Sequence, residues 1–177
     1  MSSTDGVVFT TERLRLRRFT YHDAAFLVTL LNDADFLQYI GDRGVRTDDD
    51  ARAYLDAGPF ASYAQHGFGL WCCERRDTGE AIGICGLLRR DTLPHADVGY
   101  ALLPAARGFG YAREAVAGVL RHAREALRLP LVVAIVSPHN PRSMQVLESL
   151  GFERVEMVVA APGAEPVWLF QPVDHHR

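Results

Sequence analysis

Two short segments carry the residues best suited to chemistry on a ligand. Arg107–Ala112 reads Arg-Gly-Phe-Gly-Tyr-Ala before a long helical pattern, and Asn140–Ser143 opens a shorter one. The start of a helix leaves backbone N–H groups unpaired and concentrates the positive end of the helix dipole, so an anion can bind there. Each is therefore a candidate site for an anion such as a phosphate group, although either segment alone is a common helix start.

Other nucleotide-binding motifs do not fit the same residues. In a Gly-x-Gly-x-x-Gly dinucleotide fingerprint the third glycine would follow Gly108 and Gly110, but Arg113 stands there. The expected strand ending near Val136-Ser137 is also not closed by an acidic residue, which argues against nicotinamide and flavin cofactors. The sequence contains no lysine, so a P-loop, a kinase-type lysine and a Schiff-base lysine are excluded.

The composition is that of one globular domain spanning residues 1–177, with 48% hydrophobic and 23% charged residues. A net charge of −3 and scattered arginines argue against nucleic acid as a partner. No apolar run is long enough for a membrane span and Met1–Asp5 is polar, so we expect a cytoplasmic protein without a membrane partner. The cysteines Cys72, Cys73 and Cys85 are expected to be buried thiols, with no disulfide and no metal site.

The first half of the chain predicts one strand and two helices. Thr10–Phe19 alternates between apolar and charged residues, as a half-buried strand does. Thr20–Asp23 resembles a capping box in front of a helix over Ala24–Leu31. A second helix is expected after Thr47, where three aspartates favour its positive end, and Pro59 should break or kink it.

The second half predicts a mostly β region with two more helices. Three strands joined by short turns are expected to form an antiparallel meander, and a later β-branched run should be a buried, parallel strand. The expected strands are Gly69–Glu74, Ala81–Leu88, Val98–Leu103, Leu131–Val136, Glu153–Ala160 and Val167–Gln171, and the helices are Phe109–Leu129 and Pro141–Leu150. This order indicates an α/β fold with one mixed sheet.

The segments that open the two later helices also resemble a known family. After a strand and Pro104, the residues Arg107, Gly110 and Ala112 occupy the three defining positions of an Arg/Gln-x-x-Gly-x-Gly/Ala signature. The second helix begins at Asn140 and ends in Leu-Gly-Phe at 150–152. Together these motifs resemble the coenzyme A site of the Gcn5-related N-acetyltransferase (GNAT) family. The resemblance implies a largely antiparallel sheet flanked by helices, with a splayed central pair of strands.

Further segments resemble one branch of that family, the RimJ/RimL-like ribosomal-protein alanine N-acetyltransferases. These are Thr11–Arg17, Thr78–Gly83 and Asp97–Tyr100. The resemblance implies acetyl-CoA as the co-substrate and direct transfer of its acetyl group to a primary amine, with a protein or peptide N-terminal α-amine favoured. The implied coenzyme contacts are Leu102, Leu103, Arg107, Gly108, Phe109, Gly110, Tyr111, Ala112, Asn140 and Ser143.

Direct transfer requires an oxyanion site, a base for the amine and an acid for the leaving thiolate. Backbone N–H groups over Tyr100–Leu103 are the oxyanion candidates. The base candidate is Asp97, where the branch often has a glutamate, with His95 or Glu165 as alternatives.

The residue that would act as the general acid differs from the common family pattern. Where many members have a tyrosine, this chain has Leu147, and the expected substitute is Ser143, four residues earlier on the same helix face. A helix serine with no catalytic duty remains the alternative, as does departure of the thiolate without an acid.

Four aromatic residues are expected to frame the pocket for the amine acceptor: Phe36, Tyr39, Trp71 and Tyr100. The acceptor itself stays open. A small amine (an antibiotic, a polyamine or an amino acid) is the alternative to a protein N-terminus, and a non-catalytic acyl-CoA sensor is a third reading. Homodimer formation is left open.

Overall fold

The computed structural model describes residues 6–173 and begins with a β-hairpin rather than one long strand. Strand β1 covers Val7–Thr10 and β2 covers Leu14–Arg17. The expectation of a single strand over Thr10–Phe19 is therefore wrong at its start, because the Thr11 N–H bonds the Leu14 carbonyl 2.9 Å away and closes a turn. Within β2 the alternation holds, with both leucines buried.

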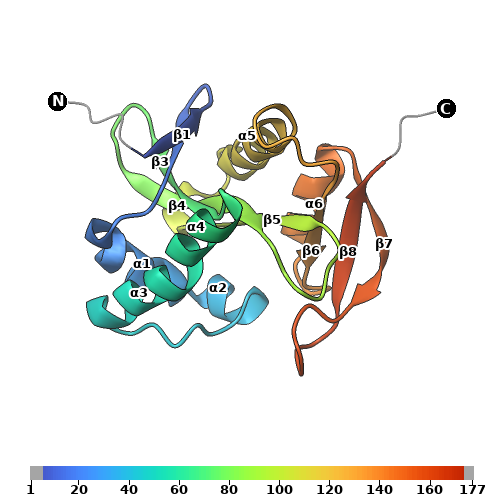
Figure 1. The fold of residues 1–177 in the computed structure, drawn as a ribbon, viewed down its shortest axis with the longest axis horizontal. Helices are drawn as coiled ribbons and strands as arrows, with labels where there is room; N and C mark the ends of the chain where they lie inside the picture. The colour runs from blue at the N-terminus through green and yellow to red at the C-terminus, as the bar shows by residue number, and fades with distance from the viewer. Residues whose placement is uncertain (1–5, 174–177) are drawn as a thin grey trace.

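Helices α1 to α4 follow and form one layer (Figure 1). Thr20 and Asp23 make a complete capping box at a 3-10 turn, η1, and Thr47 and Asp50 make another before α3. Pro59 does not end its helix, because a π-helical turn, η2, continues the chain from α3 into α4. The elements are η1 Tyr21–Asp23, α1 Ala24–Leu31, α2 Ala34–Tyr39, α3 Asp48–Leu55, η2 Asp56–Phe60 and α4 Ala61–His66.

The strands form one mixed sheet in the order β1-β2-β3-β4-β5-β6-β8-β7. All neighbours are antiparallel except β5 and β6, which run parallel as expected. The remaining strands are β3 Leu70–Arg75, β4 Ala81–Leu88, β5 Ala96–Leu102, β6 Val132–Val136, β7 Phe152–Val158 and β8 Val167–Pro172. The meander and the buried parallel strand are thus confirmed.

The parallel pair is short, and this creates an opening in the sheet. Only Ala96 with Val132 and Asp97 with Val133 are paired between β5 and β6. Beyond them β5 stays bonded to β4, whereas β6 continues beside β8. The carboxyl half of β5 consequently has no strand partner on its β6 side, and the two strands part there as the expected splayed pair.

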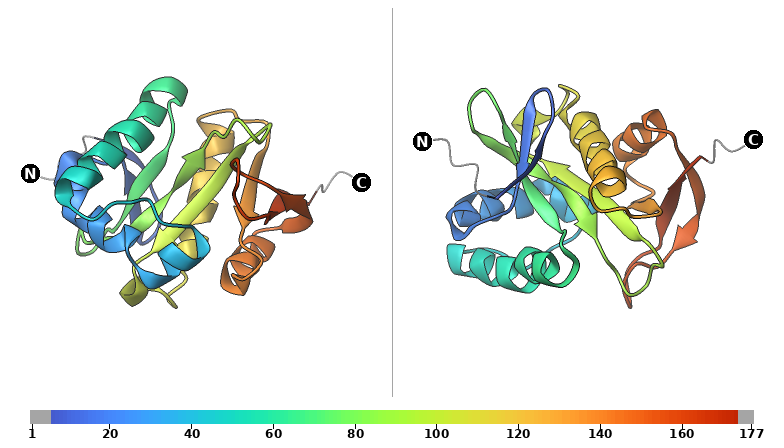
Figure 2. Two further views of the ribbon diagram at one scale, coloured as in Figure 1. Left: turned by 90° about the horizontal axis from the view of Figure 1, so that it is seen from below. Right: turned by 45° about the horizontal axis from the view of Figure 1, so that its top comes forward.

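Helices cover both faces of the sheet (Figure 2). Helix α5, Tyr111–Glu125, packs Val116 and Val119 into a core with Trp71, while α1 and α3 pack Leu27 and Leu55 on the other face. Cys72 and Cys73 point to these opposite cores, and all three thiols are buried. Helix α6, Pro141–Ser149, contacts α5. Within residues 6–173 no helix combines the length and apolar character that a bilayer crossing requires; Met1–Asp5 lie outside the described residues.

Candidate active site

The first helix-start segment lies at the carboxyl end of β5. After Leu102 and Leu103 the chain makes a 3-10 turn, η3 (Pro104–Ala106), and then a tight turn into α5. Gly108 and Gly110 have φ of 87° and 80°, a left-handed conformation that strains residues with a Cβ. We call Arg107–Ala112 the coenzyme loop, after the ligand that its motif predicts. Its two glycines are required by the backbone path, as the sequence pattern suggested.

This loop presents unpaired donors at the start of a long helix. In the described part of the chain, the N–H groups of Tyr111, Ala112 and Arg113 have no hydrogen-bond partner, and Gly110 caps the helix without a side chain. Glu114 is the first residue whose N–H bonds back, to the Gly110 carbonyl at 3.1 Å. Donors of this kind, together with the dipole of a 15-residue helix, make a site for an anion.

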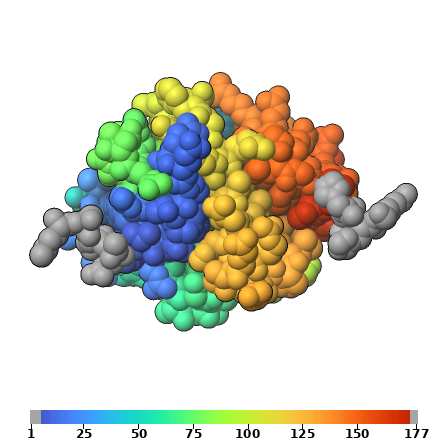
Figure 3. All heavy atoms as spheres, turned by 90° about the horizontal axis from the view of Figure 1, so that it is seen from above, coloured from blue at the N-terminus to red at the C-terminus, as the bar shows by residue number. Residues whose placement is uncertain are grey.

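Glu114, a carboxylate in the first turn of α5, holds the loop in place. Glu114 accepts from the Thr11 hydroxyl at 2.5 Å, from the Arg13 N–H at 2.9 Å and from Arg13 Nε at 2.7 Å. Arg13 Nη1 also donates to the Phe109 carbonyl at 2.8 Å. Figure 3 shows the hairpin tip (blue) against the start of α5 (yellow). Burial raises the pKa of Glu114, but these hydrogen bonds outweigh it and the pKa lies below its ordinary value.

The side chain of Arg107 turns away from the loop that its backbone forms. Its guanidinium donates to Asp33, to Asp35 and to the Leu102 carbonyl. Its contribution to an anion at the loop therefore comes through the backbone, while its charge is used by two carboxylates of the α2 region.

The second helix start lies across the splay. Asn140 caps α6 by accepting from the Ser143 N–H at 3.3 Å, and Pro141 occupies the first helical position. No described residue accepts a hydrogen bond from Asn140 Nδ2. Arg113 Nε bonds Ser149 Oγ at 3.2 Å, so the first turn of α5 and the end of α6 are fastened together. The two predicted helix starts are thus on adjoining helices.

Two side chains that the sequence assigned to different roles meet in the splay. The Tyr100 hydroxyl donates to Ser143 Oγ at 3.1 Å, joining β5 to α6. Tyr100 is half-buried, and burial raises its pKa despite the opposing effect of the Ser143 contact, so the phenol keeps its proton at neutral pH. Tyr100 was expected in the acceptor wall; its hydroxyl instead lies beside the acid candidate.

The base candidate is not beside that pair. Side chains alternate along β5, so Asp97 projects from the face opposite to Tyr100. It is 1% exposed and bonds Arg90 Nε through Oδ1 at 3.1 Å. Burial raises the pKa of Asp97, although Arg90 opposes the shift. Of the alternatives, His95 is half-buried, and Glu165 is exposed in the β7–β8 connection.

Two of the four expected acceptor-wall residues are core residues instead. Trp71 is 1% exposed and packs edge-on to Phe9 at 6.1 Å between ring centres, on the α5 face. Phe36 is buried among α1 and α3 on the other face. Neither residue lines an open surface, because both large apolar side chains pack in the core between the sheet and the helices. Tyr39, on α2, remains half-buried.

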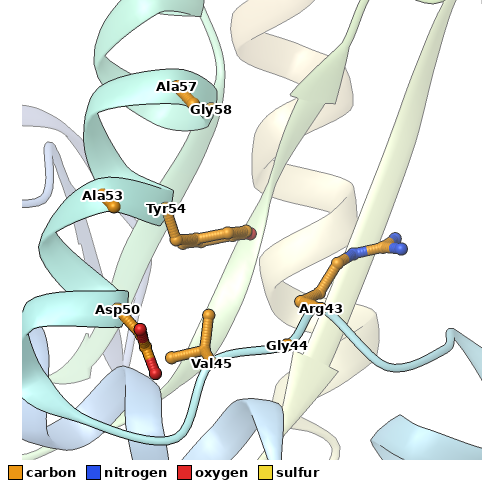
Figure 4. Close-up of a pocket in the computed structure, with 8 residues that line it drawn as sticks. All are labelled: Arg43, Gly44, Val45, Asp50, Ala53, Tyr54, Ala57 and Gly58. Carbon is orange, nitrogen blue, oxygen red and sulfur yellow. The ribbon is translucent and has the colours of Figure 1, made fainter.

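A groove of about 460 Å³ lies between α3 and the loop before it (Figure 4). Arg43 from the loop and Tyr54 from α3 project into the same space. Burial raises the pKa of Tyr54, and the nearby Arg43 opposes this. The groove is lined by Arg43, Gly44, Val45, Asp50, Ala53, Tyr54, Ala57 and Gly58. Sequence reasoning missed it because residues 41–46 carry no motif and α2 is very short.

Comparisons with known proteins identify the family of this chain. Residues 13–153, more than half of the chain, match the acetyltransferase (GNAT) domain. The relative named "Uncharacterized N-acetyltransferase YoaA" of Bacillus subtilis (strain 168) is 29% identical over 149 residues, 83% of each chain.

Two solved structures show the same fold. Ribosomal-protein-S5-alanine acetyltransferase from Vibrio fischeri matches with a TM-score of 0.74 and 20% identity, covering 95% of this chain and 97% of its own. Spermidine N-acetyltransferase from Vibrio cholerae, solved with CoA and spermine, matches with a TM-score of 0.74 and 18% identity, covering 91% and 95%. The chain therefore belongs to the acetyltransferase (GNAT) domain family and is an acyltransferase of the N-acetyltransferase type.

Proposed function

We propose that this protein transfers the acetyl group of acetyl-CoA to the α-amine of a protein or peptide, with both substrates bound at once. The observation that carries the proposal is the placement of two helix starts, at Gly110 and Asn140, on either side of the opening between β5 and β6. The pyrophosphate lies on the N–H groups of the coenzyme loop. The pantetheine arm pairs with the free edge of β5, like an added strand.

Asn140 and the β5 backbone hold the reacting end of this arm. Asn140 Nδ2 donates to a pantetheine carbonyl while Oδ1 caps α6, so one side chain serves both purposes. The N–H groups over Tyr100–Leu103 on the unpaired side of β5 receive the oxyanion that forms when the amine attacks the thioester carbon. No metal is required by these steps.

Tyr100 and Ser143 supply the proton for the leaving thiolate. Ser143 donates to the sulfur as the carbon–sulfur bond breaks, and the Tyr100 hydroxyl, 3.1 Å away, replaces that proton. Tyrosine, with an ordinary pKa of about 10, is closer to a thiol in acidity than serine is, so the phenol is the net donor. A hydroxyl pair here takes the place of the family tyrosine, since Leu147 is a buried core residue.

Asp97 is the proposed base, acting through a water molecule. A peptide α-amine has a pKa of about 7.7–8, so part of it is already neutral near pH 7 and a carboxylate suffices. Because Asp97 is buried and bonded to Arg90, water reaches it only when the Arg90 side chain, which is 28% exposed, moves aside.

The groove beside α3 favours a peptide over a polyamine as acceptor. Its only lining carboxylate, Asp50, accepts from the N–H groups of Arg46 and Thr47 and is committed to capping α3. Arg43 adds a positive charge that repels a polycation.

Thr11 and Arg13, from the segment that resembles the RimJ/RimL-like branch, hold Glu114 and so support the coenzyme loop.

A thiol-release assay with acetyl-CoA tests the proposal against a panel of acceptors: α-amine peptides, peptides with only a lysine amine, spermidine and an aminoglycoside. We expect turnover on the α-amine peptides. Turnover confined to spermidine or the aminoglycoside would contradict the proposed acceptor and would show that the acceptor is a small amine. Tight coenzyme A binding without turnover on any acceptor would leave the sensor function.

A further inference from the structure

Arg107 joins the coenzyme loop and the adjoining end of β5 to the start of α2, which lies far earlier in the sequence. Its Nη2 donates to Asp33 Oδ2 at 2.6 Å and to the Leu102 carbonyl at 2.9 Å, and its Nη1 donates to Asp35 Oδ2 at 2.8 Å. The guanidinium thus connects the coenzyme loop, the end of β5 and the start of α2. It is 28% exposed, and the Asp33 side chain is 11% exposed, so this cluster is partly shielded from water.

The carboxylates that Arg107 contacts also set the position of α2. Asp33 caps this helix, because its side chain accepts from the Phe36 N–H at 3.3 Å. Helix α2 spans only Ala34–Tyr39, too short to be stable without tertiary anchors. Phe36 in the core is one anchor and Arg107 is the other. The loop with Arg43 follows α2 directly, so the placement of α2 affects the approach of that loop to the groove, together with the bond from Asn32 Nδ2 to the Val45 carbonyl at 2.7 Å.

The backbone of Arg107 belongs to the coenzyme loop, so a ligand bound to this loop affects the position of Arg107. It immediately precedes Gly108, whose φ of 87° marks a turn with no Cβ to restrain it. A pyrophosphate seated on the loop fixes the backbone on both sides of this turn, including the Cα that carries the guanidinium. Immobilising one end of a short ion-pair bridge restrains the other end, which is α2.

We propose that Arg107 is a positioning residue that couples occupancy of the coenzyme loop to ordering of α2 and the groove loop, residues 33–46. The inference rests on the proposed function, because it requires coenzyme A at the coenzyme loop. Its consequence is that the coenzyme, once bound, strengthens binding of the amine acceptor. Coupling between sites in proteins is commonly 5–150-fold in affinity, and we expect about tenfold here.

Hydrogen–deuterium exchange of residues 33–46, measured with and without coenzyme A, tests the coupling without an acceptor. In the wild type, coenzyme A should slow exchange of this segment about tenfold. Arg107→Gln keeps the backbone donors and the Arg/Gln signature, so its calorimetric Kd for coenzyme A should stay within about threefold while the protection of residues 33–46 disappears. Asp33→Asn should lose the protection in the same way.

Two further variants keep the test decisive. Arg52→Gln removes an exposed ion pair with Asp49 on α3 and should leave the protection unchanged. Asp35→Asn removes only one of the two ion pairs and should reduce the protection partly, which serves if Asp33→Asn fails to fold.

Three results would overturn the inference. Full protection in Arg107→Gln means that the guanidinium does not transmit it. Loss of coenzyme affinity in parallel with protection makes Arg107 a ligand to phosphate. Absence of coenzyme A binding in the wild type overturns the proposed function as well, and calorimetry alone distinguishes that case from the other two.

Discussion

The proposed coenzyme site and the proposed acceptor groove are built differently. On the coenzyme side, two glycines with positive φ shape the loop, and the clamp from Glu114 to Thr11 and Arg13 holds it, so that it presents unpaired helix N–H groups. On the acceptor side, a very short helix and a turn-rich loop border an open groove lined by Arg43 and Tyr54. The first is made mainly of backbone and the second mainly of side chains.

This contrast explains which half of the function can be stated specifically. A diphosphate is recognised through donors that every residue has, so what the sequence must preserve is glycine and helix start. An acceptor amine is recognised through side chains that can differ between proteins with the same fold. The proposed donor site therefore depends on backbone geometry, whereas the proposed acceptor groove depends on side chains such as Arg43.

The strongest challenge to the coenzyme side is Gly110→Glu. A side chain at φ of 80° strains the turn, and its carboxylate lies where the pyrophosphate should bind, so we expect no measurable affinity for coenzyme A by calorimetry. Gly163→Glu is the matched control: φ is 76° in an exposed turn with open space around it. Unchanged affinity in a folded Gly110→Glu protein would contradict the site.

Asp97→Asn separates catalysis from stability. Loss of a general base should lower kcat by about a hundredfold, at the low end of the usual range. Burial raises the folded pKa of Asp97, so its stabilising contribution is complete below the unfolded pKa and is lost as pH rises through the folded pKa.

An asparagine carries no charge, and the variant should therefore have a Tm near pH 7 no lower than that of the wild type. Full kcat, or a lower Tm near pH 7, would show that Asp97 serves the fold through its bond to Arg90.

Ser143→Ala and Tyr100→Phe test the proton donors on the coenzyme side. Each should lower kcat by roughly tenfold, since a thiolate leaves more readily than most groups and needs less help. The Kd for coenzyme A should change little in both. Combining the two changes should cost little beyond either alone, because the hydroxyls act in series. Gln145→Ala, at an exposed position of the same helix, is the control, and additive losses in the double variant would refute a shared path.

Glu114→Gln should have the smallest effect. Losing charged hydrogen bonds to Thr11 and Arg13 should lower Tm near pH 7 by about 2–4 °C and weaken coenzyme A binding a few-fold. The pKa of Glu114 is depressed, so its contribution is present above the unfolded pKa and is lost as pH falls through the folded pKa. The Tm difference should therefore vanish in acid. Glu125→Gln, at an exposed site, should show no difference at either pH.

Much of the fold was accessible from sequence because its signals are local. A few neighbouring residues are enough to predict several elements. Examples are the capping residues Thr20 and Thr47, the β-branched run ending at Val136, and Gly151 after α6. The turn at Thr11 was missed, because the alternating pattern continues across it while the partner that fixes it, Glu114, is about a hundred residues away.

The candidate site shows the same difference between local signals and long-range contacts. The coenzyme loop and the start of α6 were proposed from their resemblance to the family's motifs. Trp71 and Phe36 could not be placed, because an aromatic side chain fits a core as well as a pocket wall. The meeting of Tyr100 with Ser143, and of Arg107 with Asp33, depends on how β5 and β6 part. The separation of β5 and β6 is a property of the whole sheet, and it cannot be predicted from any single segment of the sequence.

A crystal structure grown with acetyl-CoA is the most direct measurement of whether the opening between β5 and β6 holds the donor. We predict the pyrophosphate on the N–H groups of Gly108 to Ala112, the pantetheine along the carboxyl half of β5, and the sulfur within hydrogen-bonding reach of Ser143 Oγ. Acetyl-CoA bound elsewhere, with these N–H groups facing only solvent, would contradict the account.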